Sequence, residues 1–177
     1  MFVKTQSFIS TKVTKYLPEF VYGSIDGTVT TFAIISGIAG AGLDTAIVII
    51  LGFSNVLADG FSMASSNYLS EQAHQDQVSG NEHHNPIKTA LATFFSFVSI
   101  GSIPVISYIV ATVIPGLHAY AFWFAAFCTG LTFLGIGATR GAITEKNPWR
   151  TALETLAIGT IAALVAYGVG AFLERLL

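Results

Sequence analysis

Charged residues are scarce in this sequence. Asp, Glu, Lys and Arg make up 10% of its 177 residues, whereas a soluble domain contains about 25%. Hydrophobic residues account for 53%, and the mean hydropathy is +0.67. This composition excludes an ordinary soluble domain and indicates an integral membrane protein, whose immediate partner is the lipid bilayer.

Cysteine and clustered basic residues are almost absent too. The one cysteine, Cys128, lies in an apolar run and has no partner for an intramolecular disulfide. The net charge is −2 and no basic patch accompanies aromatic residues, so nucleic acid is not an expected partner. Residues 1–17 lack a continuous apolar run and a small-residue cleavage site, which argues against a cleaved secretory signal. No Ser/His/Asp or HExxH arrangement suggests an enzyme.

Apolar stretches separated by turn signals dominate the chain instead. We expect an all-α integral membrane protein with five transmembrane helices. Residues 1–17 would be a cytoplasmic or interfacial segment, and residues 18–177 a single transmembrane domain. Asn-Pro pairs at 85–86 and 147–148 predict helix starts, and Pro104 should kink the third helix near Ile100. The approximate spans are 20–42, 45–70 with a cytoplasmic extension to about 79, 87–113, 119–139 and 149–173.

The positions of the basic residues predict the orientation in the membrane. In the five-helix arrangement all lysines and arginines except Arg175 fall on one side, which should be cytoplasmic. The N-terminus is therefore expected inside and the C-terminus outside. Five helices cannot divide into two equal repeats, so a symmetric pathway requires a second copy of the chain. The small-residue step Gly23-xxx-Gly27 offers close contact for such a homodimer.

The second helix carries a polar stripe in its apolar surroundings. Asn55, Asp59, Met63 and Asn67 recur every four residues and therefore share one helix face. A carboxylate at the centre of a membrane helix costs about 2.5–3.5 kcal/mol on insertion scales. Such a residue persists only where it has a partner, a cavity or a function, so this stripe is the first candidate for a functional site.

A second acid lies at a similar depth in the first helix. Asp26 is about six residues, or roughly 9 Å, into that helix, and the antiparallel second helix returns Asp59 and Met63 to comparable depth. Carboxylates and amides combined with one thioether suit Fe²⁺ or Mn²⁺ better than Ca²⁺ or Mg²⁺. Structural roles remain open: Asp59 can brace another helix, Met63 can fill the core, and the asparagines can join helices.

The connection between the second and third helices contains further metal-binding side chains. Glu71, His74 and Asp76, followed by Glu82, His83 and His84, are candidates for collecting metal ions at the cytoplasmic mouth. Their spacing matches no closed zinc site, and a solvated loop is the alternative interpretation.

Two stretches resemble the helix-one and helix-two signatures of the vacuolar iron transporter family. They are residues 22–32 (YGSIDGTVTTF) with 37–41, and residues 58–64 (ADGFSMA) with 67–70 (NYLS). A weaker match covers residues 153–170. The resemblance implies a five-helix homodimer that exchanges Fe²⁺, and often Mn²⁺, for protons and moves metal out of the cytosol. It also implies a pathway at the dimer interface, with Asp26 as its helix-one acid and Met63 as its helix-two thioether.

The sequence departs from that family in two respects. Members that load vacuoles carry a glutamate-rich metal-binding domain between helices two and three, whereas here 17 residues separate Ser70 from Lys88. Where those members have a glutamate near the cytoplasmic end of helix two, this chain has Asn67. The short form resembles prokaryotic members of a plasma membrane, with a vacuolar or other organelle membrane as the alternative.

The sequence therefore predicts a dimeric metal/proton antiporter without a permanently bound cofactor. Asp26 and Asp59 would bind Fe²⁺ or Mn²⁺ and alternate with protons, while Met63 favours transition metals. Two alternatives remain: a manganese-preferring exporter, and a non-transporting membrane sensor or assembly module whose polar stripe only joins helices.

Overall fold

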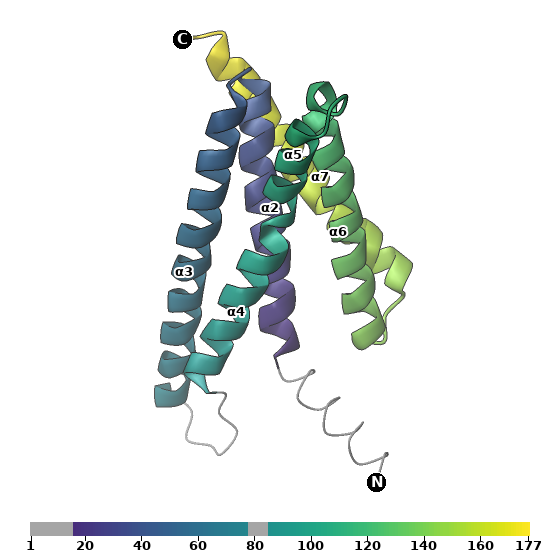
Figure 1. Ribbon diagram of the computed structural model, residues 1–177. Coiled ribbons are helices and arrows are strands. Elements are labelled where there is room, and N and C mark those ends of the chain that lie inside the picture. The colour runs from purple at the N-terminus through teal and green to yellow at the C-terminus, as the bar shows by residue number, and fades with distance from the viewer. Residues whose placement is uncertain (1–15, 78–84) are drawn as a thin grey trace.

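The computed structural model describes residues 16–77 and 85–177, and the regular structure in these ranges is entirely helical (Figure 1). The all-α prediction is therefore confirmed, with five long helical segments that alternate in direction. The N-terminal end of the bundle is where α2 begins and α3 ends, and the C-terminus lies at the opposite end (Figure 1). The segments are α2 (Leu17–Gly40), α3 (Thr45–Gln77), α4 (Pro86–Gly101) continued by α5 (Ile103–Val113), α6 (Ala121–Ile143) preceded by the short 3₁₀ helix η1 (His118–Tyr120), and α7 (Pro148–Glu174).

Local signals determine where these helices begin and end. Asn85 and Asn147 each accept two hydrogen bonds from backbone N–H groups of the following first turn, at 3.0–3.3 Å. The prolines after them have no N–H group and lose nothing at the first helical position. Gly42 has a φ of 62°, a left-handed conformation that closes α2 at little steric cost.

The third segment breaks where the sequence predicts a kink. α4 ends at Gly101 and α5 begins at Ile103, which places Pro104 in the first turn of α5. Proline cannot donate the hydrogen bond that a continuous helix would direct to the carbonyl of Ile100. The break therefore has a local cause, although it lies about one to two residues beyond the predicted position.

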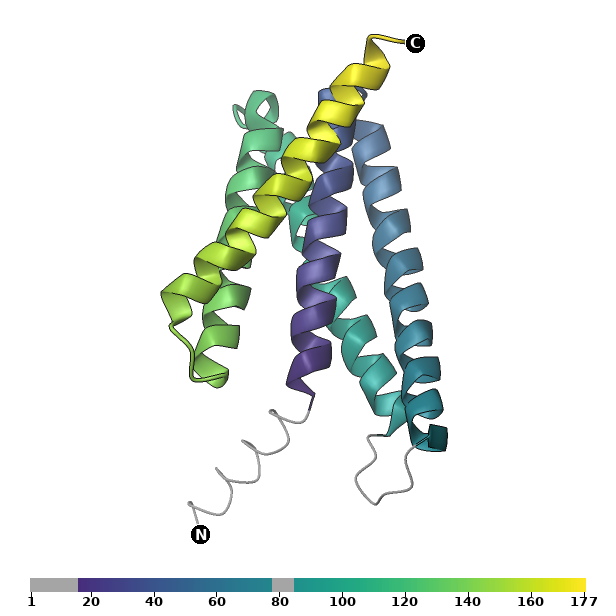
Figure 2. The same cartoon turned by 180° about the vertical axis from the view of Figure 1, so that it is seen from behind.

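Four segments are long and apolar enough to cross a membrane, which makes this a multi-pass membrane protein. They are Thr45–Gln77, Pro86–Val113, His118–Ile143 and Pro148–Glu174. α2 is not among these four, because Glu19, Asp26 and many small or hydroxyl side chains lower its hydropathy. Its central position explains this composition. α2 contacts α3, α4, α5, α6 and α7, so much of its surface faces protein (Figures 1 and 2).

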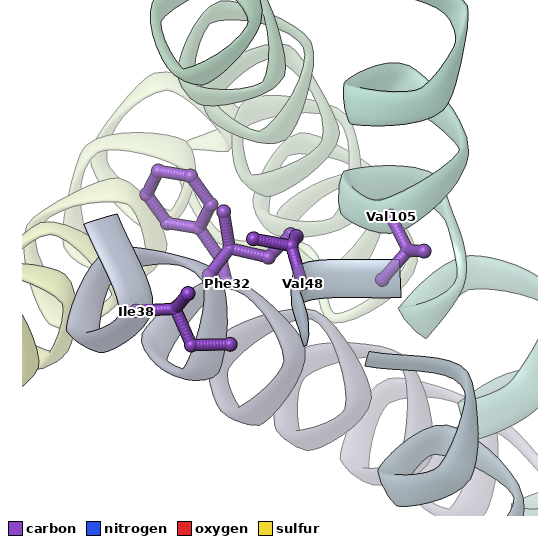
Figure 3. Close-up of a cluster of buried hydrophobic side chains, with 5 residues drawn as sticks. Phe32, Ile38, Val48 and Val105 are labelled. Atoms are coloured by element: carbon purple, nitrogen blue, oxygen red, sulfur yellow. The ribbon is translucent and has the colours of Figure 1, made fainter. Parts of the chain in front are cut away.

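The apolar core lies towards the C-terminal end of α2. Phe32, Ile35 and Ile38 of α2 pack with Val48 of α3 and Val105 of α5 (Figure 3). Ile35 and Val105 are completely buried. This cluster joins three helices and holds α2 and α3 as antiparallel neighbours.

The buried polar side chains of the bundle carry hydroxyl groups. Every buried polar side chain in the described ranges is a serine or a threonine, and many donate to a carbonyl one turn earlier, as Thr28 does to Ser24 at 2.7 Å. Such pairing satisfies the hydroxyl inside its own helix. Among residues 16–77 and 85–177, no Asp or Glu is fully buried as a residue, and Asp26 and Asp59 are half-buried.

The step Gly23-xxx-Gly27 packs α2 against α4 of the same chain. A Cβ atom on Gly23 would lie 2.7 Å from the carbonyl oxygen of Thr93, and one on Gly27 would lie 2.8 Å from that of Phe97. The prediction that this step joins two copies of the chain is therefore wrong. Close approach of two backbones needs small residues in either case, so the sequence pattern alone cannot identify the partner helix.

α7 covers only part of α2. The two helices cross near the C-terminal end, where a Cβ atom on Gly170 would lie 2.9 Å from the carbonyl carbon of Gly37. Towards the N-terminal end α7 diverges from α2 (Figure 2). On this face the N-terminal half of α2 borders a groove, and Tyr22 is exposed there while Asp26 is half-buried.

Candidate functional site

Asp26 lies in the open face of α2. Its half-buried side chain lines a groove of about 360 Å³ between α2 and α7. The neighbouring lining residues are largely apolar, among them Ile25, Val29 and Ile158. A carboxylate in such surroundings is poorly solvated and gains strongly from a proton or a cation.

Asp59 of α3 is the second carboxylate of the site. It is half-buried, and its Oδ2 accepts a hydrogen bond of 3.1 Å from Nδ2 of Asn55, four residues earlier on the same helix face. Asp26 and Asp59 are close enough to interact electrostatically. The two acids that the sequence places at similar depth therefore lie on neighbouring helices. Because their charges repel, binding of a cation or a proton between the helices is favoured.

Met63 and Asn67 line a separate cavity of about 410 Å³. It lies on the same stripe of α3, nearer the N-terminal end of the bundle, and it is lined by neutral oxygen and sulfur donors. The lining residues are Tyr22, Ser62, Met63, Ser66, Asn67 and Ser70. Met63 and Asn67 are thus associated with one another but do not share the groove of Asp26.

A hydrogen-bond chain orients the amide of Asn67. The Thr93 hydroxyl donates to the carbonyl of Thr89 at 3.1 Å, so Thr93 Oγ1 acts as the acceptor towards Asn67 Nδ2 at 2.7 Å. The donor side of the amide is therefore directed towards α4, and the carboxamide oxygen lies on the opposite side of the group. Asn67 thus joins two helices, as one interpretation of the sequence holds, and it also retains the atom that can bind a cation.

Thr30 does not contribute its hydroxyl to the carboxylates. It donates to the backbone carbonyl of Asp26 at 2.6 Å, within the same helix. This hydroxyl is therefore occupied by local backbone hydrogen bonding and is a weak candidate for a metal ligand.

The remaining predicted residues do not form a cluster. Glu71 accepts a hydrogen bond of 3.3 Å from Gln75, and His74 and Asp76 are exposed. Across residues 16–77 and 85–177, no three His, Cys, Asp or Glu side chains gather closely enough to hold a metal ion. Glu82, His83 and His84 lie outside the described residues. Within the described ranges, one chain therefore offers a pair of acids and separate neutral donors.

Tyr22 is the site residue that the sequence did not single out. It lines both the groove of Asp26 and the cavity of Met63 and Asn67. Its spacing of four residues from Asp26 is the signal that places both side chains on one face of α2. Aromatic residues are common near the ends of membrane helices, where they anchor the helix at the interface. Tyr22 therefore did not stand out in the sequence as a site residue.

Known proteins resemble this chain over most of its length. The model of the VIT family matches residues 17–82 and 77–171, in two segments that overlap from the end of α3 onwards. A vacuolar iron transporter of Toxoplasma gondii is 26% identical over an alignment that covers 90% of this chain and 74% of the relative. A vacuolar iron transporter of Plasmodium falciparum is 25% identical, with coverage of 90% and 82%.

A third relative is more similar in sequence, but over a shorter part of the chain. The vacuolar iron transporter of Plasmodium berghei is 44% identical over 61 residues, which cover 34% of this chain and 22% of the relative. The two longer alignments each extend over 225 residues, more than the 177 of this chain, so the relatives contain positions without a counterpart here.

Proposed function

The chain belongs to the VIT family, and from that premise we propose that it is a transporter, not an enzyme, that moves Fe²⁺ or Mn²⁺ out of the cytosol in exchange for protons. The observation that carries the proposal is that two half-buried carboxylates, Asp26 and Asp59, lie on neighbouring antiparallel helices of a membrane protein. Family membership supports a transported ion as the cargo of this pair.

The donor atoms along the polar face of α3 support a transition metal as the transported ion. Met63 provides a thioether, and the amides of Asn55 and Asn67 provide oxygen atoms in addition to the two carboxylates. Ca²⁺ and Mg²⁺ prefer oxygen alone, whereas Fe²⁺ and Mn²⁺ accept nitrogen and sulfur more readily. In this proposal Met63 discriminates among cations, and Asp26 and Asp59 supply the charge.

Exchange with protons follows from the repulsion between the two carboxylates. In poorly solvated surroundings the pair needs compensating positive charge, which either a divalent cation or protons can supply. Metal binding therefore displaces protons, and proton binding releases the metal. This mutual exclusion is the physical basis of an antiporter.

A homodimer would complete the site. One chain offers Asp26 in the groove between α2 and α7, with Asp59 on the neighbouring α3, and a second copy related by a two-fold axis would double the number of ligands. Covering this face would also remove a carboxylate from lipid. We propose that α2 crosses the membrane in this assembly, with the N-terminus in the cytoplasm and the C-terminus outside.

We further propose a role for the cytoplasmic end of α3 and a membrane in which the protein resides. Glu71, His74 and Asp76 would attract ions at the end of α3, close to where the two segments matched by the family model overlap. The absence of a long insertion at this point supports a short, prokaryotic type of member in the plasma membrane. The alternative is an organelle membrane, as the names of the relatives indicate for those proteins.

Transport by Asp26→Asn protein in proteoliposomes tests the proposal. We expect wild-type protein to move Fe²⁺ or Mn²⁺ inwards while protons move outwards, and the variant to lose at least about 100-fold in rate, because one of two charges is removed. The matched control is Asp44→Asn, which changes an exposed acid at the other end of the bundle. Wild-type rates in the Asp26 variant would contradict the assignment.

Competition and stability measurements distinguish the alternative functions. A manganese-preferring exporter would transport Mn²⁺ in preference to Fe²⁺ when both are present. A non-transporting sensor or assembly module would show no metal flux. The hydrogen bond of Asn67 with Thr93 favours this alternative, because it shows that one residue of the polar stripe joins two helices. Flux that depends on Asp26 would exclude that module.

A further inference from the structure

Tyr22 occupies the boundary between the two cavities of the site. Its side chain is 60% exposed, and it lines both the groove of Asp26 and the cavity of Met63 and Asn67. On α2 it precedes Asp26 by four residues, about 6 Å along the axis. Tyr22 is therefore nearer the N-terminal end of the bundle than the carboxylate.

The two cavities present different chemistry to a cation. The groove of about 360 Å³ combines one carboxylate, Asp26, with apolar side chains from α2 and α7. The cavity of about 410 Å³ contains hydroxyl, amide and thioether groups but no carboxylate. An ion that passes from one to the other must exchange neutral donors for a charged one.

Such an exchange is costly if the cation loses its old ligands before it gains new ones. A ligand that reaches both cavities removes this cost, because it stays bound while the others change. The Tyr22 hydroxyl has lone pairs that can coordinate a cation, and it can do so as a neutral phenol without giving up its proton. The residue shared by both linings thus has suitable chemistry.

We propose that the Tyr22 hydroxyl is a relay ligand that passes a divalent transition-metal ion between the Met63–Asn67 cavity and Asp26. This role rests on the proposed transport function and adds a residue to its pathway. Tyr22 binds the ion in transit, while the thioether and amide donors are exchanged for the carboxylate. No covalent bond is made or broken in this step.

A relay ligand affects the rate of transport more than the affinity for the metal. It stabilises the state between two binding positions, whereas the ligands of each position remain in place. Loss of the hydroxyl should therefore lower the maximum rate and leave the half-saturating metal concentration unchanged. A residue that only supports the fold would instead lower the thermal midpoint or change both kinetic parameters.

Three single variants in proteoliposomes test the relay with Mn²⁺ as the probe. Tyr22→Phe keeps the ring but removes the oxygen, and we expect its maximum uptake rate to fall about tenfold. Tyr22→Gln keeps an oxygen but removes the ring, and we expect it to transport faster than Tyr22→Phe. Tyr68→Phe is the matched control, because the Tyr68 hydroxyl accepts a hydrogen bond from Gln72 and lines a different groove of α3 and α4.

The order of the two Tyr22 variants decides between an oxygen ligand and a packing ring. If Tyr22→Phe transports at the wild-type rate, or faster than Tyr22→Gln, the relay is wrong. Thermal midpoints of the purified variants show whether each remains folded. Failure of the proposed function would appear differently, as the absence of Mn²⁺ uptake by wild-type protein relative to protein-free liposomes.

Discussion

The two halves of α2 have different surroundings. In the C-terminal half, Phe32, Ile35 and Ile38 lie in the apolar core, and α7 crosses at Gly37 in backbone contact. In the N-terminal half, α4 covers one face, while the face with Tyr22 and Asp26 remains open as α7 diverges. One continuous helix is thus a packed scaffold at one end and a binding surface at the other.

This difference indicates how the protein can hold charged residues in a membrane. The packed half contributes stability through contacts between apolar side chains, which do not depend on any ligand. The open half leaves Asp26 and Tyr22 free to meet an ion or a second copy of the chain. Substitutions in the packed half should therefore change stability, and those in the open half should mainly change transport.

The largest effect on stability should come from Ile35→Ala. Ile35 is completely buried, and its truncation leaves a cavity that costs about 2–5 kcal/mol. Ile25→Ala, the matched substitution in the open half, should cost much less because Ile25 is only partly buried where it lines the groove of Asp26. Unfolding in detergent by a denaturant series measures both. Equal losses would remove the distinction between the two halves.

A smaller effect is expected when the bond between α3 and α4 is lost. Asn67→Leu removes the donor to Thr93, and interhelical hydrogen bonds in membranes contribute about 0.6 kcal/mol on average. A double-mutant cycle with Thr93→Val isolates this coupling. A coupling energy of zero would show that the bond does not hold these helices together.

The smallest effect is expected for the thermal stability of Asp26→Asn protein without metal. Unlike the two substitutions above, this one should not lower stability. The substitution removes the repulsion between Asp26 and Asp59, so the thermal midpoint should stay equal or rise slightly while transport is lost. Addition of Mn²⁺ should stabilise wild-type protein more than the variant. A clear fall in the metal-free midpoint would identify Asp26 as a structural residue.

Helix positions were largely predictable because their causes are local. The Asn-Pro pairs act through hydrogen bonds to the next turn, and Pro104 breaks the third segment by removing one N–H group. The polar stripe of α3 followed from helical spacing, and the short turn between α2 and α3 indicated that Asp26 and Asp59 lie on antiparallel neighbouring helices. The bond between Asn55 and Asp59 is a direct product of that spacing.

Partner helices were not predictable in the same way. Gly23 and Gly27 permit close packing, but only the arrangement of α2 and α4 determines that the packing occurs within one chain. Likewise, residues of α3 and α7 determine that Tyr22 adjoins two cavities. These contacts join residues far apart in the sequence, and their geometry depends on how whole helices cross.

The sequence by itself determined the membrane-protein composition, the helices and their ends, and the stripe of candidate ligands, because these depend on composition and on residues within about one helical turn. The tertiary structure decided which face of α2 stays open, how the amide of Asn67 is oriented, and that Met63 and Asp26 occupy separate cavities. Those outcomes depend on the angles at which α4 and α7 pack against α2, which the packing of side chains from several helices sets together.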